Sequence, residues 1–457
     1  MVPLWPVGPE VRSGAVRRTI VVLGCALALL VSLAISAPAV TASSADRKHQ
    51  HRHHHATSWR PAEGGFFNNP WGERADKFRI ERQIVAAIRH ARKGSYIRIA
   101  VYSFDRVNVA RALIDAHRRG VHVQVLHNDH QVTAAMRMLR TELGTDRGRR
   151  SWDHICTTGC RSEQGVLHDK IYLFDRTGAA ENVVMTGSAN LTLNATAHQF
   201  NDLLVQRNAP RLHHVLLRLF WELRRDRTAQ PLFEHKVLKH YRLWVLPHPR
   251  TTAANDPVMQ VLRQVRCRGA RGNTGVDGRT KIRVSMHSWN GDRGTWIADK
   301  LRRLYARGCN VKVMWSLAGA EMKQAIGAPT PRGEVPRRAD GYNTDCDVLQ
   351  EVDMYSHQKY LTISGRYGRD RRASYVFTGS SNWTAQGLSG DEMILRAHGL
   401  RLVRQWNHNF DFIWRHRARQ VGGERGFRPG APSCPYYYRT TRPHRGLAFS
   451  GEHWEAD

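Results

Sequence analysis

The sequence predicts an α/β protein built from two similar halves. Residues 96–126 and residues 281–317 share one order: an alternating strand, a polar loop, an amphipathic helix and a Val-rich strand. A strand–helix–strand unit with this crossover length predicts parallel pairing in an α/β sheet. Gly120 and Gly308 stand where a helix C-terminal glycine belongs, so each helix is expected to end there.

The repeat extends in both directions along the chain. An expected helix at 80–91 corresponds to one at 257–265, and Phe220-Trp221 corresponds to Ile413-Trp414. We therefore expect a first half at 65–240 and a second half at 241–457, packed with pseudo-two-fold symmetry around one shared site. The helix at 212–225 is apolar on one side and Arg-rich on the other, which favours core packing over a membrane-facing patch. The tail from residue 421 is expected to be irregular and held by Cys434.

The N-terminus has the features of a secretory signal peptide. Basic residues precede an apolar run at 20–35, and small residues follow it up to Ala42. We expect a signal peptide at 1–42, a secreted protein and a disordered His-rich leader at 43–64. Arg17-Arg18 leaves a twin-arginine export route open. Later apolar runs are too short to span a bilayer, so an integral membrane protein is not expected.

The charge balance indicates an anionic partner. Lys and Arg number 70 against 39 Asp and Glu, which gives a formal net charge of +31. Such a field favours phosphodiesters, phospholipid surfaces or nucleic acid. The alternative is an Arg-rich composition that only keeps a secreted protein soluble. The charge therefore indicates a class of partner but does not identify a reaction.

Cysteine usage suggests disulfides. Loss of the signal peptide would remove Cys25 and leave an even number of cysteines: Cys156, Cys160, Cys267, Cys309, Cys346 and Cys434. Cys156 and Cys160 could close a small loop, although the pairing does not follow from the sequence. A rival hypothesis is a metal site built on His154, Cys156 and Cys160.

A His-x-Lys pattern occurs once in each half. LHDKIYLFD contains His168, Lys170 and Asp175, and SHQKYLTIS contains His357 and Lys359. Side chains alternate along a strand, so each histidine shares a face with its lysine. A single histidine in a buried strand is more often a core residue with satisfied hydrogen bonds than a catalyst. The repetition of the pair in matching places argues for a site.

A small polar turn and an acidic residue follow each pair. TGSANLT and TGSSNWT carry the turns, and FNDLLV and GDEMIL carry the acids. Ser and Asn in a glycine turn commonly bond only local backbone. Here they recur in the same order in both halves, so we take them as site residues. They are Ser188, Asn190, Ser380, Asn382, Asp202 and Glu392.

Brought together, these side chains would bind one tetrahedral phosphoryl group. The lysines would offset charge on its non-bridging oxygens, and the Asn and Ser side chains would orient it. One histidine could attack phosphorus and form a phosphohistidine, while the other protonates the leaving alkoxide. A carboxylate behind each ring would hold its tautomer, a role suited to Asp202 and Glu392. This chemistry needs no metal or other cofactor.

HxKxxxxD followed by GSxN, present twice, resembles the phospholipase D superfamily. The resemblance implies that His168 is the nucleophile and His357 the general acid, and that a monomer suffices because both motifs are in one chain. It also implies that Asp175 buttresses the fold. The second copy departs from the pattern, because Ser364 stands where the aspartate is expected. We expect this departure to remove one internal hydrogen bond.

The resemblance implies a phosphodiesterase and leaves its substrate open. Export and positive charge favour a secreted bacterial phospholipase D-like protein that hydrolyses or transphosphatidylates phospholipids at a membrane surface, releasing the head group and phosphatidate. A secreted non-specific nuclease is the alternative, because a basic groove can also follow a nucleic-acid backbone. A catalytically silent phosphodiester-binding protein is a third hypothesis.

Overall fold

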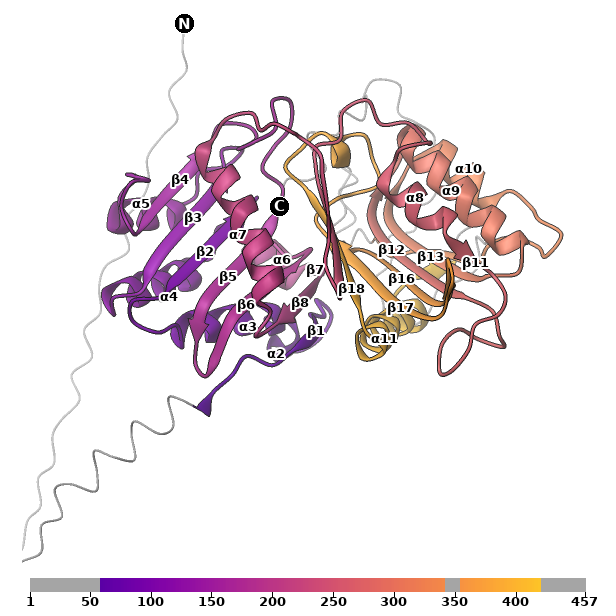
Figure 1. Ribbon diagram of the computed structural model, residues 1–457, viewed down its shortest axis with the longest axis horizontal. Helices are drawn as coiled ribbons and strands as arrows, with labels where there is room; N and C mark the ends of the chain where they lie inside the picture. Colours follow the sequence, from indigo (N-terminus) through magenta and orange to yellow (C-terminus); the bar gives the residue numbers. More distant parts are fainter. Residues whose placement is uncertain (1–57, 342–353, 421–457) are drawn as a thin grey trace, which may run out of the picture. The chain divides into compact units, whose positions relative to one another are not determined.

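The computed structural model describes residues 58–341 and 354–420 (Figure 1). The expected signal peptide, the histidine tract at 47–55, Cys346, Cys434 and the tail from 421 lie outside the described residues. No helix in the described ranges is long and apolar enough to cross a bilayer.

The first half is a seven-stranded mixed sheet in the order β1-β8-β6-β5-β2-β3-β4. The helices α3, α4 and α5 bury their apolar sides against one face of this sheet, and α7 covers the other face. The strands are β1 (Gly64–Phe67), β2 (Tyr96–Val101), β3 (His122–Asn128), β4 (Trp152–Cys156), β5 (Lys170–Thr177), β6 (Ala180–Gly187) and β8 (Asp202–Gln206). The helices are α3 (Arg79–Arg89), α4 (Val107–Arg118), α5 (Ala134–Leu143) and α7 (Pro210–Arg225).

The second half repeats this arrangement around the path β19-β14-β13-β12-β16-β17-β18-β10-β9. Its strands include β9 (Glu234–Val237), β10 (Tyr241–Val245), β12 (Lys281–Trp289), β13 (Asn310–Ala318), β14 (Arg337–Ala339), β16 (Lys359–Tyr367), β17 (Asp370–Gly379), β18 (Met393–His398) and β19 (Arg419–Gln420). The helices α8 (Pro257–Arg263), α9 (Gly291–Ala306) and α10 (Ala320–Gly327) bury one face, and α11 (Leu400–His416) packs on the other.

The predicted repeat and its parallel units are confirmed. β2 pairs in parallel with β3, and β12 pairs in parallel with β13. Gly120 and Gly308 follow the intervening helices with φ of 84° and 99°. A side chain at either position would be strained, which is why each helix ends at a glycine.

The apolar side of α7 belongs to the protein core. Leu216, Phe220 and Leu223 are fully buried in a cluster that also contains Trp406 and Phe410 of α11. Core packing, rather than a membrane-facing patch, therefore accounts for this helix. Since one cluster takes residues from both halves, their packing is continuous.

Two disulfides are present among the described cysteines. Cys156 pairs with Cys160, and Cys267 pairs with Cys309. The first pairing closes a small loop, a possibility that the cysteine spacing suggested without deciding the pairing. The second pairing had no signal in the sequence, because it joins segments 42 residues apart.

The two halves differ at the position of the missing aspartate. Asp175 forms an ion pair of 2.7 Å with Arg98, which agrees with a buttressing role. Arg283 occupies the matching position in β12 and donates instead to the backbone and side-chain oxygens of Asn310. Burial lowers the pKa of Arg283 to about 10. Ser364 accepts a hydrogen bond from the Gly275 amide, so a neutral contact stands at the position of the missing aspartate. The nearby Lys281 is 3.8 Å from the carboxylate of Asp411 in α11.

We expect Ser364→Asp to stabilise the protein. Ser364 lies opposite Lys281 on the neighbouring strand, and the new carboxylate would face both Lys281 and Arg283. The free energy of unfolding should rise by about 1 kcal/mol in urea denaturation, since a partly buried ion pair would form. An unchanged or lower free energy of unfolding would show that the neutral contacts already suffice. Ser364→Asn is the matched uncharged control.

Candidate active site

Segments of the two halves pair with each other around the two histidines. β7 (Gln199–Phe200) runs parallel to β15 (Tyr355–Ser356), and Leu167 forms a matching bridge with Asp391. Each histidine follows directly. The His168 amide donates to Asp391 O at 3.0 Å, and the His357 amide donates to Phe200 O at 2.9 Å. The site is therefore built from both halves with local two-fold symmetry.

Each histidine is linked to its lysine through the backbone. Lys170 Nζ donates to His168 O at 2.7 Å, and Lys359 Nζ donates to His357 O at 2.9 Å. All four side chains are buried, with at most 4% of their surface exposed. Two buried cations beside two imidazoles are a suitable environment for a phosphate.

A carboxylate from the other half lies behind His168. Glu392 Oε1 is 2.9 Å from His168 Nδ1. With Nδ1 directed at the carboxylate, Nε2 is the nitrogen that remains for attack on phosphorus. Burial raises the pKa of Glu392 to about 7, against the opposing effect of Lys170.

The partner of His357 is Asn201, not Asp202. His357 Nδ1 lies 3.1 Å from both Asn201 Oδ1 and Ser188 O. Both are acceptors, so Nδ1 carries the proton and Nε2 does not in the neutral ring. Burial, followed by the charge of Lys359, lowers the pKa of His357 well below its usual value. This shift favours the neutral ring in the free protein.

Asp202 points away from the histidine because neighbouring residues of a strand face opposite sides. Its carboxylate accepts hydrogen bonds from Thr378 Oγ1 and Trp406 Nε1 of the second half. Burial raises the pKa of Asp202. Asp202 therefore joins the two halves.

We expect Asp202→Ala to reduce stability. The change leaves the buried donors of Thr378 and Trp406 without their acceptor. The free energy of unfolding should fall by about 2–4 kcal/mol in urea denaturation. Asp115→Ala, on the exposed side of α4, is the control and should stay within about 0.5 kcal/mol of the parent protein. Equal effects of the two substitutions would contradict the bridging role.

The serines of the two glycine turns contact the residues that orient the histidines. Ser188 Oγ donates to Asn201 Oδ1 at 2.8 Å. Ser380 Oγ bonds Glu392 and lies 3.5 Å from Asp169 Oδ1. These contacts place both serines behind the imidazoles. Their binding to phosphate stays a prediction.

Asn190 and Asn382 are held in equivalent ways. Asn190 Oδ1 accepts from the Ser103 amide at 3.5 Å, and Asn382 Oδ1 accepts from the Ser288 amide at 3.2 Å. Because the amide oxygen is held by the backbone, the Nδ2 donor end has a defined direction. This geometry suits the predicted role of orienting a phosphate oxygen.

Aromatic and imidazole rings outside the predicted motifs surround the histidines. Tyr102 lies edge-on to His168, with centroids 5.1 Å apart, and stacks on His130. His287 lies 4.7 Å from His357 by ring centroids. Burial lowers the pKa of His130 to about 4, so this ring is neutral. Tyr102 and His287 occupy matching positions in VYSF and MHSW, so the repeat itself was the available signal.

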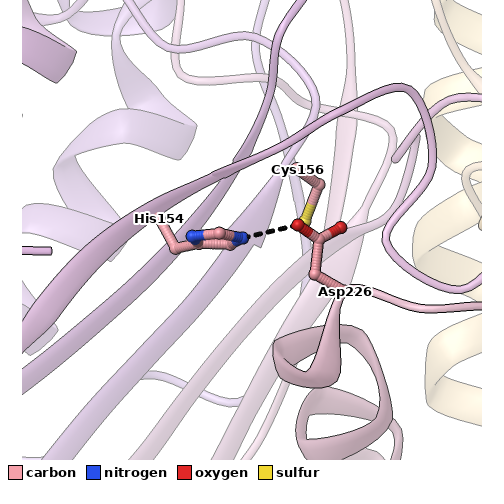
Figure 2. A group of neighbouring side chains, drawn as sticks. All are labelled: His154, Cys156 and Asp226. Carbon is pink, nitrogen blue, oxygen red and sulfur yellow. Dashed lines mark hydrogen bonds and ion pairs between the residues drawn. The ribbon is translucent and has the colours of Figure 1, made fainter. Parts of the chain in front are cut away.

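The proposed metal site at His154 is contradicted by the disulfide. His154 Nε2 forms a 2.8 Å contact with Asp226, and Cys156 lies beside them (Figure 2). A metal binds the thiolate form of cysteine, and the sulfur of Cys156 is already bonded to Cys160. The cluster is therefore a structural hydrogen bond between His154 and Asp226 next to a disulfide.

Comparisons with known proteins agree with this architecture. Residues 84–224 and 278–414 both match the family model described as cardiolipin synthase, PLD-like domain. Phosphatidylserine synthase from Haemophilus influenzae is 11% identical with a TM-score of 0.50, covering 82% of this chain and 92% of that one. At this identity the likeness shows the fold alone. The search of curated proteins found no match.

Two other solved structures share less with the chain. Polyphosphate kinase from Porphyromonas gingivalis is 14% identical with a TM-score of 0.49, and the match covers 77% of this chain but only 50% of that one. The phospholipase D family member Nuc from Salmonella typhimurium is 23% identical with a TM-score of 0.27, covering 35% of this chain and 91% of that one. The family match takes in more than half of the sequence and places one copy in each half. The chain therefore belongs to the phospholipase D superfamily, as a protein with two PLD-like domains.

Proposed function

We propose that this protein is a secreted phosphodiesterase that hydrolyses or transphosphatidylates phospholipids through a phosphohistidine. The observation that carries the proposal is the pairing of two histidines from two halves with unlike partners. His168 faces the carboxylate of Glu392, whereas His357 faces the amide of Asn201. A carboxylate stabilises an imidazolium, and an amide only fixes the tautomer. The two rings are therefore suited to different steps.

In the first step, His168 Nε2 attacks phosphorus in line and the bond to the leaving alkoxide breaks. The alkoxide takes a proton from His357 Nε2 as the head group departs. Binding of the anionic diester beside Lys359 favours the protonated form of His357 that this step needs. Lys170 and Lys359 offset the charge that develops on the non-bridging oxygens.

In the second step, His357 acts as a base. Its neutral Nε2 takes a proton from water or an alcohol, which attacks phosphorus on the side vacated by the head group. The bond from phosphorus to His168 Nε2 breaks, and phosphatidate or a new phosphatidyl ester leaves. Glu392 stabilises the positive His168 ring while the covalent intermediate exists.

The choice of phospholipid rests on charge and on the family. A net charge of +31 favours binding to an anionic lipid surface. The matched family model carries the name of an enzyme of phospholipid metabolism, cardiolipin synthase. The same charge would also attract nucleic acid, so a nuclease is the competing function that the test must separate.

The test is rapid quench with phosphatidylcholine vesicles and, in parallel, with DNA, followed by mass analysis of the peptide that contains His168. A phosphatidyl adduct together with choline release would support the proposal. A nucleotide adduct with intact vesicles would make the protein a nuclease. Binding of either substrate without an adduct or turnover would indicate a silent binding protein.

A further inference from the structure

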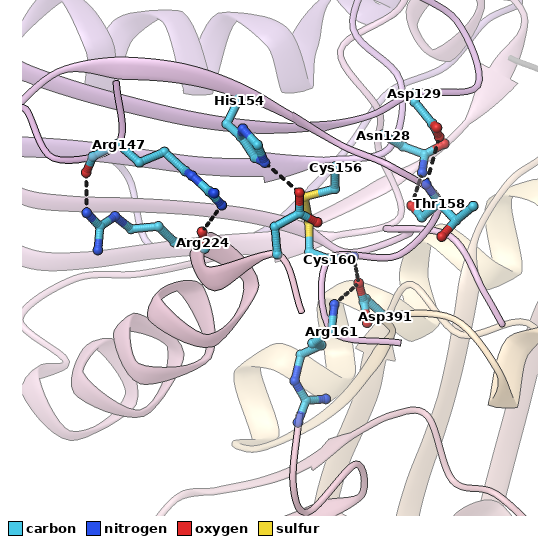
Figure 3. Close-up of a disulfide and its surroundings, with 11 residues drawn as sticks. Asn128, Asp129, Arg147, His154, Cys156, Thr158, Cys160, Arg161, Arg224 and Asp391 are labelled. Atoms are coloured by element: carbon cyan, nitrogen blue, oxygen red, sulfur yellow. Dashed lines mark hydrogen bonds and ion pairs between the residues drawn. A yellow bond between two sulfur atoms is a disulfide. The ribbon is translucent and has the colours of Figure 1, made fainter. Parts of the chain in front are cut away.

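A short disulfide-closed loop reaches from the first half to the residue beside Glu392 (Figure 3). This disulfide loop, residues 156–161, begins at the end of β4 and is closed by Cys156 and Cys160, which are both fully buried. The amides of Cys160 and Arg161 donate to Asp391 Oδ2 at 2.6 and 3.1 Å. One carboxylate oxygen of the second half is thus held by two consecutive amides of the first half.

Asp391 connects this loop to both members of the His168–Glu392 pair. Its carbonyl accepts from the His168 amide at 3.0 Å, and its own amide donates to Val166 O at 2.9 Å. Glu392 is the next residue in the chain. A displacement of Asp391 would therefore move the amide of the nucleophile and the carboxylate behind it together.

Arg161 supports Glu392 from the other side. Its side chain is fully buried, pairs with Glu222 at 3.1 Å and donates to Leu246 O at 2.9 Å. The Leu246 amide in turn donates to Glu392 O at 2.8 Å. The disulfide loop thus supports Glu392 by two routes, one through Asp391 and one through Leu246.

The other histidine lacks this support. Phe200 takes the place of Asp391 beside His357 and offers only its carbonyl to the His357 amide. Phe200 has no carboxylate, so it offers no side-chain acceptor like the one that the Cys160 and Arg161 amides contact in Asp391. Within residues 58–341 and 354–420, only the carboxylate-backed histidine has this support.

We infer that Asp391 and the disulfide loop are positioning elements for the His168–Glu392 pair, so that full turnover requires the Cys156–Cys160 bond. Without the bond, the loop can move so that the amides of Cys160 and Arg161 no longer stay in contact with the Asp391 carboxylate. A displacement of about 1 Å at a nucleophile can cost on the order of 10²-fold in rate. The inference rests on the proposed phosphodiester chemistry and not on its lipid substrate.

The experiment compares two disulfide variants on bis-p-nitrophenyl phosphate, a simple diester that does not depend on lipid or nucleic-acid recognition. Cys156→Ala/Cys160→Ala removes the loop bond. Cys267→Ala/Cys309→Ala is the matched control in the second half. The Cys267–Cys309 bond has a sequence separation of 42, whereas that of the Cys156–Cys160 bond is 4. Loss of the Cys267–Cys309 bond should therefore reduce the melting temperature more. We expect kcat of the loop variant to fall by about tenfold or more at nearly constant KM, and kcat of the control to stay within about two-fold.

Unchanged kcat in the loop variant, equal loss in both variants, or a rise in KM alone would overturn the inference. Asp391→Ala and Asp391→Asn provide a second test should the loop variant fail to fold. The Asn side chain keeps an oxygen acceptor for the two amides, so it should restore most of the kcat that Ala loses. Equal kcat in these two variants would also overturn the inference. A parent protein inactive on this diester, on vesicles and on DNA would instead refute the chemistry itself.

Discussion

Replacement of His168 by alanine is expected to abolish turnover while the fold is kept. His168 forms the only covalent bond between enzyme and substrate in the proposed mechanism. Its loss should therefore lower kcat on the order of 10⁴-fold or more. Head-group release and circular dichroism on the same sample would separate chemistry from folding. His214→Ala, on the exposed side of α7, is the matched control.

The role of His357 can be isolated with a leaving group that needs no proton. p-Nitrophenolate departs unprotonated, so His357→Ala should still form the phosphohistidine from a p-nitrophenyl phosphodiester. It should then stall, because no base activates water. We expect a burst of about one p-nitrophenolate per protein and an adduct on the His168 peptide.

The opposite pattern would reverse the assignment. A burst from His168→Ala, with the adduct on the peptide that contains His357, would make His357 the nucleophile. Steady turnover by His168→Ala with neither adduct would refute a phosphohistidine altogether.

Glu392→Gln is expected to slow turnover strongly without removing either histidine. The amide oxygen of Gln can still hold His168 Nδ1, as Asn201 holds His357, but it cannot stabilise a positive ring. We expect kcat to fall by about 10²-fold or more, with KM little changed, because the lost interaction belongs to the transition state and the intermediate. Single-turnover kinetics on vesicles would measure it.

The same substitution should alter the pH profile. Burial raises the pKa of Glu392 to about 7, so the carboxylate becomes neutral as the pH falls through this value. The rate of the parent protein should therefore decline on the acid side near pH 7. Glutamine does not titrate, so Glu392→Gln should lack this part of the decline.

Asn201→Ala is the control for the Glu392 experiments. It removes the neutral partner of the other histidine, and the loss of an oriented tautomer should leave the acid-side decline in place. If Asn201→Ala removed that decline and Glu392→Gln did not, the carboxylate would not be the titrating group.

Local patterns in the sequence were enough to predict most of the fold and to select the His-x-Lys pairs that the structure brings together. The two α/β units, the glycines that end their helices and the two His-x-Lys strands depend on spacings of a few residues, and such periodicities follow from backbone geometry. The repetition of the motifs in one order predicted that both histidines serve a single site. The same repetition singled out His168 and Glu392, although nearly half of the sequence separates them.

Only the tertiary structure decided which side chains meet across the two halves. Asn201 rather than Asp202 faces His357, because a one-residue difference along a strand turns a side chain to the opposite face. The hydrogen bonds from the Cys160 and Arg161 amides to Asp391 join two segments that share no sequence pattern. Such contacts depend on the packing of distant segments, and local periodicity holds no information about that packing.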